Sequence, residues 1–225
     1  MREWLISLLL SLPSILIALS VHECAHAWAA YKLGDSTAKY LGRMSINPMR
    51  HLDPLGVLCM IFAGFGWARP VPVNSRNLKN PKRDMVLVSL AGPASNILLA
   101  FIGLLVLKII SAVGTPLLYP LITADPTSFE FVALKMLLSF LMLFCQLNAG
   151  LAVFNLLPIP PLDGSHLLAL ILPSRIYFKY VQYERYISFA LVLLLVFNVL
   201  DTPLFFLRNY LLTGLEWIID LIPFL

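Results

Sequence analysis

The sequence predicts an all-α integral membrane protein: a polytopic helical bundle of about five or six hydrophobic segments, with a short membrane-associated β-hairpin or re-entrant region. Hydrophobic residues make up 60% of the 225 residues and charged residues only 12%, against about 45–50% and about 25% in ordinary soluble domains. Several apolar runs are long enough to cross a bilayer. This length suits one bundle, so we expect a single domain over residues 1–225, with a core at 1–175 and further hydrophobic segments at 186–222.

The first third of the chain should contain one long helix and an irregular region. Residues 4–30 are almost continuously apolar and predict a helix of about 27 residues that ends near Gly34. The apolar run at 55–65 is too short to span a bilayer, so we expect a re-entrant or hairpin element there. Residues 67–74 combine prolines with alternating valines, a pattern typical of an edge strand or an extended loop.

Further helices are expected at about 85–113 and about 129–156. The prolines of residues 155–164 remove backbone donors, so the third long helix must break there. A short helix should follow at about 165–172, and then hydrophobic segments at about 186–200 and 204–222.

The basic residues predict the orientation in the membrane. Nine of the 16 Lys and Arg residues lie in residues 32–83 and three lie in 175–185, whereas residues 114–128 contain none. Because Lys and Arg concentrate in cytoplasmic loops, the amino terminus should lie outside, and the motifs described next should lie toward the cytoplasmic half. Membrane topology also explains the net charge of +4 better than nucleic-acid binding does.

The most informative motif is HECAH at residues 22–26, inside the first helix. His22 and His26 are four residues apart and therefore share one face of a helix, so both imidazoles can bind one metal ion. Glu23 would then lie beside a metal-bound water as a general base. The alternative is a polar cluster that hydrogen-bonds between helices. Such residues are expensive to bury in a membrane, which favours a functional site.

A catalytic zinc ion takes three protein ligands and leaves a fourth position for water. The candidates for the third ligand are Asp35, His51, Asp53, Asp163 and His166. Asp163 lies at the proline-rich helix break, where irregular backbone in a membrane normally surrounds a protein-lined or water-filled cavity. A helix N-cap explains Asp163 equally well from the residues alone. His51 and His166 suit positions that support a metal ligand by a hydrogen bond or that lie at the surface.

Three motifs in order make the sequence resemble the site-2 proteases, which are intramembrane zinc proteases: HECAH at 22–26, GPASN at 92–96 and NLLPIPPLDG at 155–164. The resemblance implies zinc on His22, His26 and Asp163, with Glu23 as general base. It also implies that Asn155 positions the substrate or stabilises the oxyanion; a helix-end cap is the alternative for this residue. The supporting residues expected around the site are Gly92, Pro93, Asn96 and Gly164.

The resemblance further implies regulated cleavage of single-span, membrane-anchored substrates in a prokaryotic plasma membrane. The sequence resembles the minimal bacterial or archaeal branch, because it shows neither a PDZ domain nor a CBS pair. We hypothesise that residues 67–74 pair with an unwound substrate as an added strand. No nucleic-acid partner is expected, and oligomerisation is left open. A metal carrier or an inactive scaffold are the competing functions; the carrier would have no special need for Glu23 and would usually show repeated halves.

Overall fold

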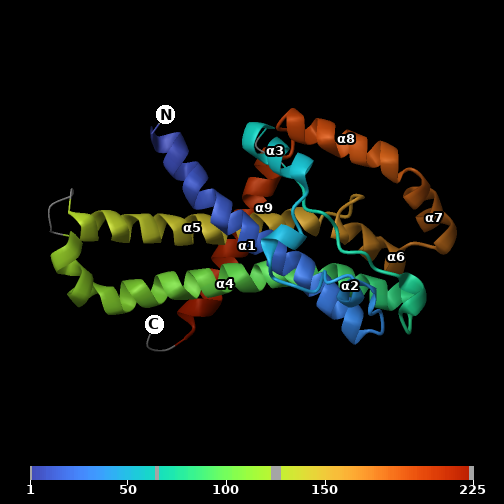
Figure 1. The fold of residues 1–225 in the computed structure, drawn as a ribbon, viewed down its shortest axis with the longest axis horizontal. Helices are drawn as coiled ribbons and strands as arrows, with labels where there is room; N and C mark the ends of the chain where they lie inside the picture. Colours follow the sequence, from blue (N-terminus) through green and yellow to red (C-terminus); the bar gives the residue numbers. More distant parts are fainter. Residues whose placement is uncertain (1, 64–65, 123–127, 223–225) are drawn as a thin grey trace.

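Three long helices form the centre of the molecule: α1 (Arg2–Lys32), α4 (Pro81–Ile122) and α5 (Phe129–Asn155). They belong to a computed structural model that describes residues 2–63, 66–122 and 128–222. In Figure 1, α4 and α5 run side by side in opposite directions, and α1 crosses them. The predicted first and third helices are confirmed, and the second is longer at both ends than the predicted 85–113.

The described residues contain three helical stretches that are long and apolar enough to span a membrane: Leu9–Lys32, Pro81–Ala112 and Phe129–Asn155. A fourth would be the pair α8 (Glu184–Val196) and α9 (Asp201–Asp220), which is bent by 87°. With three or four candidate spans, the chain is a multi-pass membrane protein. Of the predicted hydrophobic segments, the one that forms α8 is too short to span alone, because its 13 residues reach only about 20 Å at 1.5 Å per residue.

The expected β-hairpin is not formed, and no β-strand occurs in the described parts of the chain. Residues 54–63 form a helix, α3 (Pro54–Ala63), while residues 64–65 lie outside the described ranges. Residues 67–74, called the extended segment below, make one isolated antiparallel bridge, between Ala68 and Leu52. Pro70 and Pro72 have no N–H to donate, so a ladder cannot continue along this segment.

The remaining helices are short. They are α2 (Thr37–Tyr40), α6 (Leu168–Ile171), α7 (Ser174–Gln182) and the 3₁₀ helices Pro48–Arg50, Ser75–Asn77 and Asp163–Leu167.

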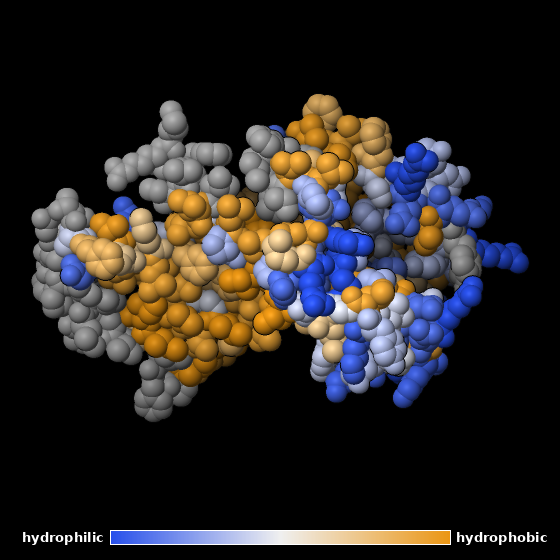
Figure 2. Space-filling model, viewed as in Figure 1, coloured by the Kyte–Doolittle hydropathy of each residue, from blue (hydrophilic) through white to orange (hydrophobic). Residues whose placement is uncertain are grey.

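Polarity divides the molecule along the direction of α4 and α5. Figure 2 shows apolar side chains over one half of the visible face and hydrophilic side chains over the other. Small residues let the helices approach closely: Ala100 of α4 and Ala149 of α5 pack with Leu215 of α9 in one buried cluster. Lys108 of α4 and Asp220 at the end of α9 form an ion pair at 2.6 Å between Nζ and Oδ1.

Candidate metal centre

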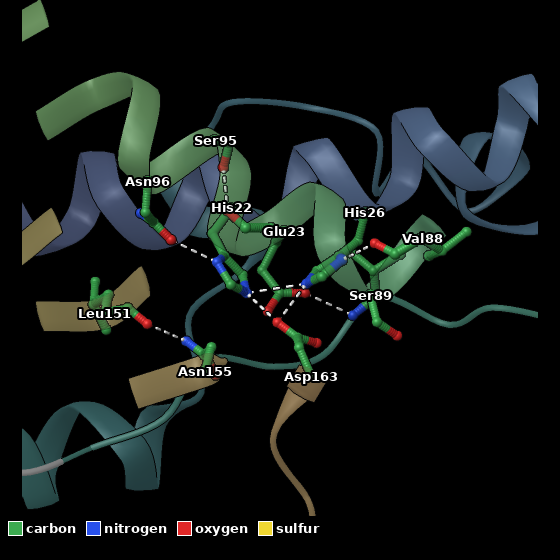
Figure 3. A network of polar contacts seen from close by, with 12 residues as sticks. His22, Glu23, His26, Val88, Ser89, Ser95, Asn96, Leu151, Asn155 and Asp163 are labelled. Atoms are coloured by element: carbon green, nitrogen blue, oxygen red, sulfur yellow. Dashed lines mark hydrogen bonds and ion pairs between the residues drawn. The ribbon is translucent and has the colours of Figure 1, made fainter. Parts of the chain in front are cut away.

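His22 and His26 lie one turn apart on the same face of α1, as their spacing requires. Both side chains are buried, and their Nε2 atoms are 3.0 Å apart. Asp163, at the first position of the 3₁₀ helix after α5, places Oδ2 3.1 Å from Nε2 of His22 and 3.2 Å from Nε2 of His26. Figure 3 shows the three side chains pointing toward one another. The helix break therefore delivers Asp163 to the histidines, 137 positions after His26.

The turn that carries Asp163 depends on the next residue, Gly164. A Cβ at this position would lie 2.3 Å from the carbonyl oxygen of Leu156 and 2.5 Å from that of Leu157. Only glycine lets the chain fold this tightly against the end of α5.

Hydrogen bonds at the far side of each ring determine which nitrogen carries the proton. Nδ1 of His26 lies 2.7 Å from the carbonyl oxygen of Val88. A carbonyl can only accept, so Nδ1 must donate and Nε2 keeps its lone pair.

The same reasoning applies to His22, whose Nδ1 lies 2.6 Å from Oδ1 of Asn96. The amide nitrogen of Asn96 is already used, because it donates to the Ala18 carbonyl at 3.2 Å and to Oδ1 of Asn148 at 3.0 Å. The oxygen of Asn96 therefore faces His22 as an acceptor, and Nε2 of His22 also keeps its lone pair.

The centre is thus a meeting point of three acceptor atoms with no donor between them. Two unprotonated Nε2 atoms cannot hydrogen-bond to each other, and buried Oδ2 of Asp163 has no hydrogen-bond partner among the described residues. A cation satisfies all three at once. Ligand atoms bound at about 2.0–2.1 Å from a tetrahedral zinc ion are about 3.3 Å from one another. The observed separations between the three atoms, 3.0 to 3.2 Å, are close to this value. The residues present therefore fit zinc.

Gly92 gives α4 a bare face against the histidines. A Cβ on Gly92 would lie 2.4 Å from Nε2 of His26 and 2.6 Å from Nε2 of His22. Pro93, which is fully buried, has no N–H for the carbonyl of Ser89 one turn earlier. Gly92 of the GPASN motif thus adapts α4 to the centre.

Glu23 is buried beside the ligand atoms of His22, His26 and Asp163. Its Oε2 accepts a hydrogen bond of 2.8 Å from the N–H of Val71 in the extended segment. Asn155 ends α5, and its Nδ2 donates to the carbonyl of Leu151 at 3.0 Å. One hydrogen of the Asn155 amide is therefore used within its own helix.

The other candidate ligands lie apart from the centre, and the His22, His26 and Asp163 group is the only potential metal cluster in the described residues. Asp53 accepts from the N–H groups of Leu55 and Gly56 at the start of α3. His51 is buried and bonds through Nε2 to the carbonyl of Ser45 at 2.6 Å.

His166 lies one 3₁₀ turn beyond Asp163, with Nδ1 3.5 Å from the Tyr177 hydroxyl. Burial lowers the pKa of His166, which keeps it neutral near pH 7.

Asp35 is fully buried, and its two oxygens accept from the N–H groups of Thr37 and Asn74 and from the Asn77 amide. Burial raises the pKa of Asp35, but the hydrogen bonds from Thr37, Asn77 and Asn74 outweigh it and leave the pKa below its usual value. Asp35 thus ties the chain just after α1 to the far end of the extended segment.

Sequence reasoning missed three groups around the centre: the Asn148 side chain, the Val88 carbonyl and the Val71 N–H. Asn148 had a signal, since it lies in an apolar helix seven residues, about two turns, before Asn155. The two backbone groups had none, because every residue except proline carries the same N–H and carbonyl.

Comparison with known proteins agrees with this centre. Residues 11–197 match the model of peptidase family M50. The chain is 44% identical over 173 residues to "Putative zinc metalloprotease YwhC" of Bacillus subtilis (strain 168), covering 77% of this chain and 74% of that protein.

It is also similar to two proteins named "Putative zinc metalloprotease Rip2". The identity is 33% over 157 residues for the Mycolicibacterium smegmatis protein and 35% over 155 residues for that of Mycobacterium tuberculosis (strain H37Rv). Each match covers 66% of this chain but only 52% of the relative. No solved structure matches the chain significantly. The chain belongs to peptidase family M50, the site-2 protease family of zinc metalloproteases.

Proposed function

We propose that the chain is an intramembrane zinc metalloendopeptidase that hydrolyses peptide bonds within or near the transmembrane segment of single-span, membrane-anchored proteins. The observation that carries this proposal is the convergence of three buried acceptor atoms, from His22, His26 and Asp163, on a candidate membrane-spanning helix. A protease of a water-filled compartment has no need to place its metal ligands on such a helix.

His22, His26 and Asp163 would hold the ion. Zinc bound there supplies a Lewis acid that polarises the scissile carbonyl and lowers the pKa of water. Glu23 takes the proton of the attacking water on Oε1, because Oε2 is already engaged by the Val71 N–H. The buried surroundings of Glu23 favour this proton transfer by excluding competing water.

Asn155 has a second amide hydrogen besides the one given to Leu151. In our proposal this hydrogen is donated to the substrate carbonyl as negative charge develops on it.

The extended segment is the proposed docking edge for an unwound substrate. The N–H of Val73 and the carbonyls of Val71, Pro72 and Val73 make no hydrogen bond to the rest of the described chain. These groups are available for strand addition. Val73→Pro removes an N–H without touching the Glu23 contact, and a raised KM at unchanged kcat is the expected result.

The chain is proposed to act as one domain in the plasma membrane of a prokaryote, with the site toward the cytoplasmic half. The concentration of Lys and Arg in residues 32–83 supports this orientation, as does the hydrophilic half of the face in Figure 2. Water would reach the centre from that half.

The proposal is tested with purified protein in detergent and a panel of fusion proteins, each carrying one spanning helix between two soluble tags. Wild-type protein should cleave at least one of them near the helix, and Glu23→Gln should bind zinc equally well but lose cleavage by at least about 1,000-fold, in the range of general acid–base effects. Metal bound by both proteins with cleavage by neither would contradict the proposal and favour a metal carrier.

A further inference from the structure

A second polar network contacts Glu23, and it is built by irregular chain rather than by the long helices. Val71 lies between Pro70 and Pro72, which have no N–H. The Val71 N–H is therefore the only main-chain donor in this stretch of three residues, and it is directed to Oε2 of Glu23 at 2.8 Å. Whatever fixes the backbone at Val71 also fixes the carboxylate of Glu23.

Arg43 holds the backbone immediately before Val71. Its Nη2 donates to the carbonyl of Arg69 at 2.5 Å and to that of Pro70 at 3.3 Å. The N–H of Arg69 donates in turn to the carbonyl of His51 at 2.7 Å. Three hydrogen bonds with Arg43 and His51, two accepted and one donated, thus hold the two residues that precede Val71.

Burying the Arg43 guanidinium costs free energy that its hydrogen bonds to the backbone do not fully recover. Arg43 is only 9% exposed, and its Nε has no hydrogen-bond partner among the described residues. No carboxylate of the described chain forms an ion pair with it. A buried guanidinium that donates to backbone carbonyls loses hydration, and the carboxylate that attracts it, Glu23, forms no direct ion pair with it. Such a group suits a position where the geometry it imposes has a use.

We propose that Arg43 is a positioning residue for Glu23. By fixing the carbonyls of Arg69 and Pro70, it holds the Val71 N–H against Oε2 and leaves Oε1 directed to the water it deprotonates. This inference rests on the proposed role of Glu23 as general base. It also joins two parts of the mechanism, because the segment that orients the base is the one proposed to receive the substrate.

The first test needs no substrate. Amide hydrogen exchange of peptides covering residues 67–74 should be faster in Arg43→Met than in wild-type protein, and it should also be faster in Glu23→Ala than in wild-type protein. Each change removes a hydrogen bond that restrains the backbone at Val71. Arg50→Met is the matched control. Arg50 also lies in residues 43–51, but its side chain donates to the carbonyl of Gly42 and not to the extended segment. Unchanged exchange in Arg43→Met would overturn the proposal, whatever the outcome of the cleavage assays.

The second test uses the fusion substrate that wild-type protein cleaves. Arg43→Met should lower kcat by about 10- to 100-fold, since misplacement of a catalytic group acts on the chemical step. KM should rise by a smaller factor than kcat falls, because the loosened segment is also the proposed docking edge. Zinc per chain should stay as in wild type. Arg43→Lys should recover at least half of the loss in the logarithm of kcat, because an ammonium group can still donate to one carbonyl.

Equal kcat in Arg43→Met and Arg50→Met, or a loss of zinc that parallels the loss of kcat, would overturn the positioning role. If Arg43→Met does not fold, Val71→Pro tests the same link directly, with the same expected loss of kcat at unchanged zinc. If Glu23→Gln cleaves as well as wild type, the proposed function fails, whereas the exchange test still reports on the Arg43 link.

Discussion

The two sides of the centre are held by different kinds of structure. On the histidine side, Asn96 and the Val88 carbonyl of α4 fix the rings, and Asn148 of α5 fixes Asn96. On the glutamate side, the contact comes from the extended segment, which has one isolated bridge and no ladder. Packed helices thus hold the two histidine ligands, whereas irregular backbone contacts the base. Metal binding should therefore be insensitive to changes in the extended segment, and catalysis should be sensitive to both sides.

The largest effect is expected from Gly92→Ala on the histidine side. Its Cβ would come within 2.4 Å of Nε2 of His26, closer than any real contact, so zinc binding and cleavage should both be lost. The control is Gly214→Ala in α9, where a Cβ meets nothing within 4 Å and the change should be neutral or should stabilise by up to about 1 kcal/mol. Zinc content and thermal unfolding in detergent measure both; full zinc binding by Gly92→Ala would contradict the described centre.

Asn155→Ala should have the next largest effect, on turnover alone. Removing one oxyanion donor typically lowers kcat by about 10²- to 10³-fold, and zinc content should not change because Asn155 does not contact the ligands in the structure. Steady-state cleavage of the fusion substrate measures it. A helix-end cap alone would instead give a lower melting temperature with kcat preserved.

Asn96→Ala should weaken zinc binding without abolishing it. The substitution leaves Nδ1 of His22 without its acceptor, and loss of such a partner typically costs about 10- to 100-fold in metal affinity. Asn148→Ala should cost less, because Asn96 keeps its bond to the Ala18 carbonyl. Competition with a zinc chelator ranks the variants, and an Asn148→Ala defect larger than that of Asn96→Ala would show that α5 acts by another route.

The smallest effect on the metal centre is expected from Asp35→Asn, which should act on stability in a pH-dependent way. Four hydrogen-bond donors hold the carboxylate: the N–H and the hydroxyl of Thr37, the N–H of Asn74 and the amide of Asn77. The neutral amide should therefore destabilise the protein by about 1.5–3 kcal/mol near pH 7. The folded pKa of Asp35 is lowered, so its stabilisation is present above the unfolded pKa of about 3.9 and is lost as pH falls through the lower folded value.

Melting temperatures at pH 7 and at about pH 3 test this dependence. The difference between wild type and Asp35→Asn should shrink at the lower pH, while the effect of histidine protonation appears in both proteins and cancels. A difference that is the same at both pH values would contradict the charge-based role of Asp35.

The long helices and the ligand pair could be predicted because their signals are local. Apolar runs specify α1, α4 and α5, and the four-residue spacing specifies the shared face of His22 and His26. Asp163 could be assigned only through the family resemblance, since the residues alone left a helix cap equally open. Of the two alternatives for residues 67–74, the extended loop is formed and the edge strand of a hairpin is not, since Pro70 and Pro72 cannot donate to a ladder. The contact of Glu23 with the Val71 N–H could not be predicted, because no sequence pattern marks a particular backbone N–H.

X-ray absorption at the zinc edge of purified protein tests the central claim most directly. The account predicts one zinc ion per chain with two imidazole nitrogens and oxygen ligands at about 2.0–2.2 Å, and the same spectrum in Glu23→Gln, because His22, His26 and Asp163 are positioned without Glu23. A sulfur ligand from Cys24, the cysteine of the HECAH motif, or a coordination shell that changes in Glu23→Gln, would contradict it.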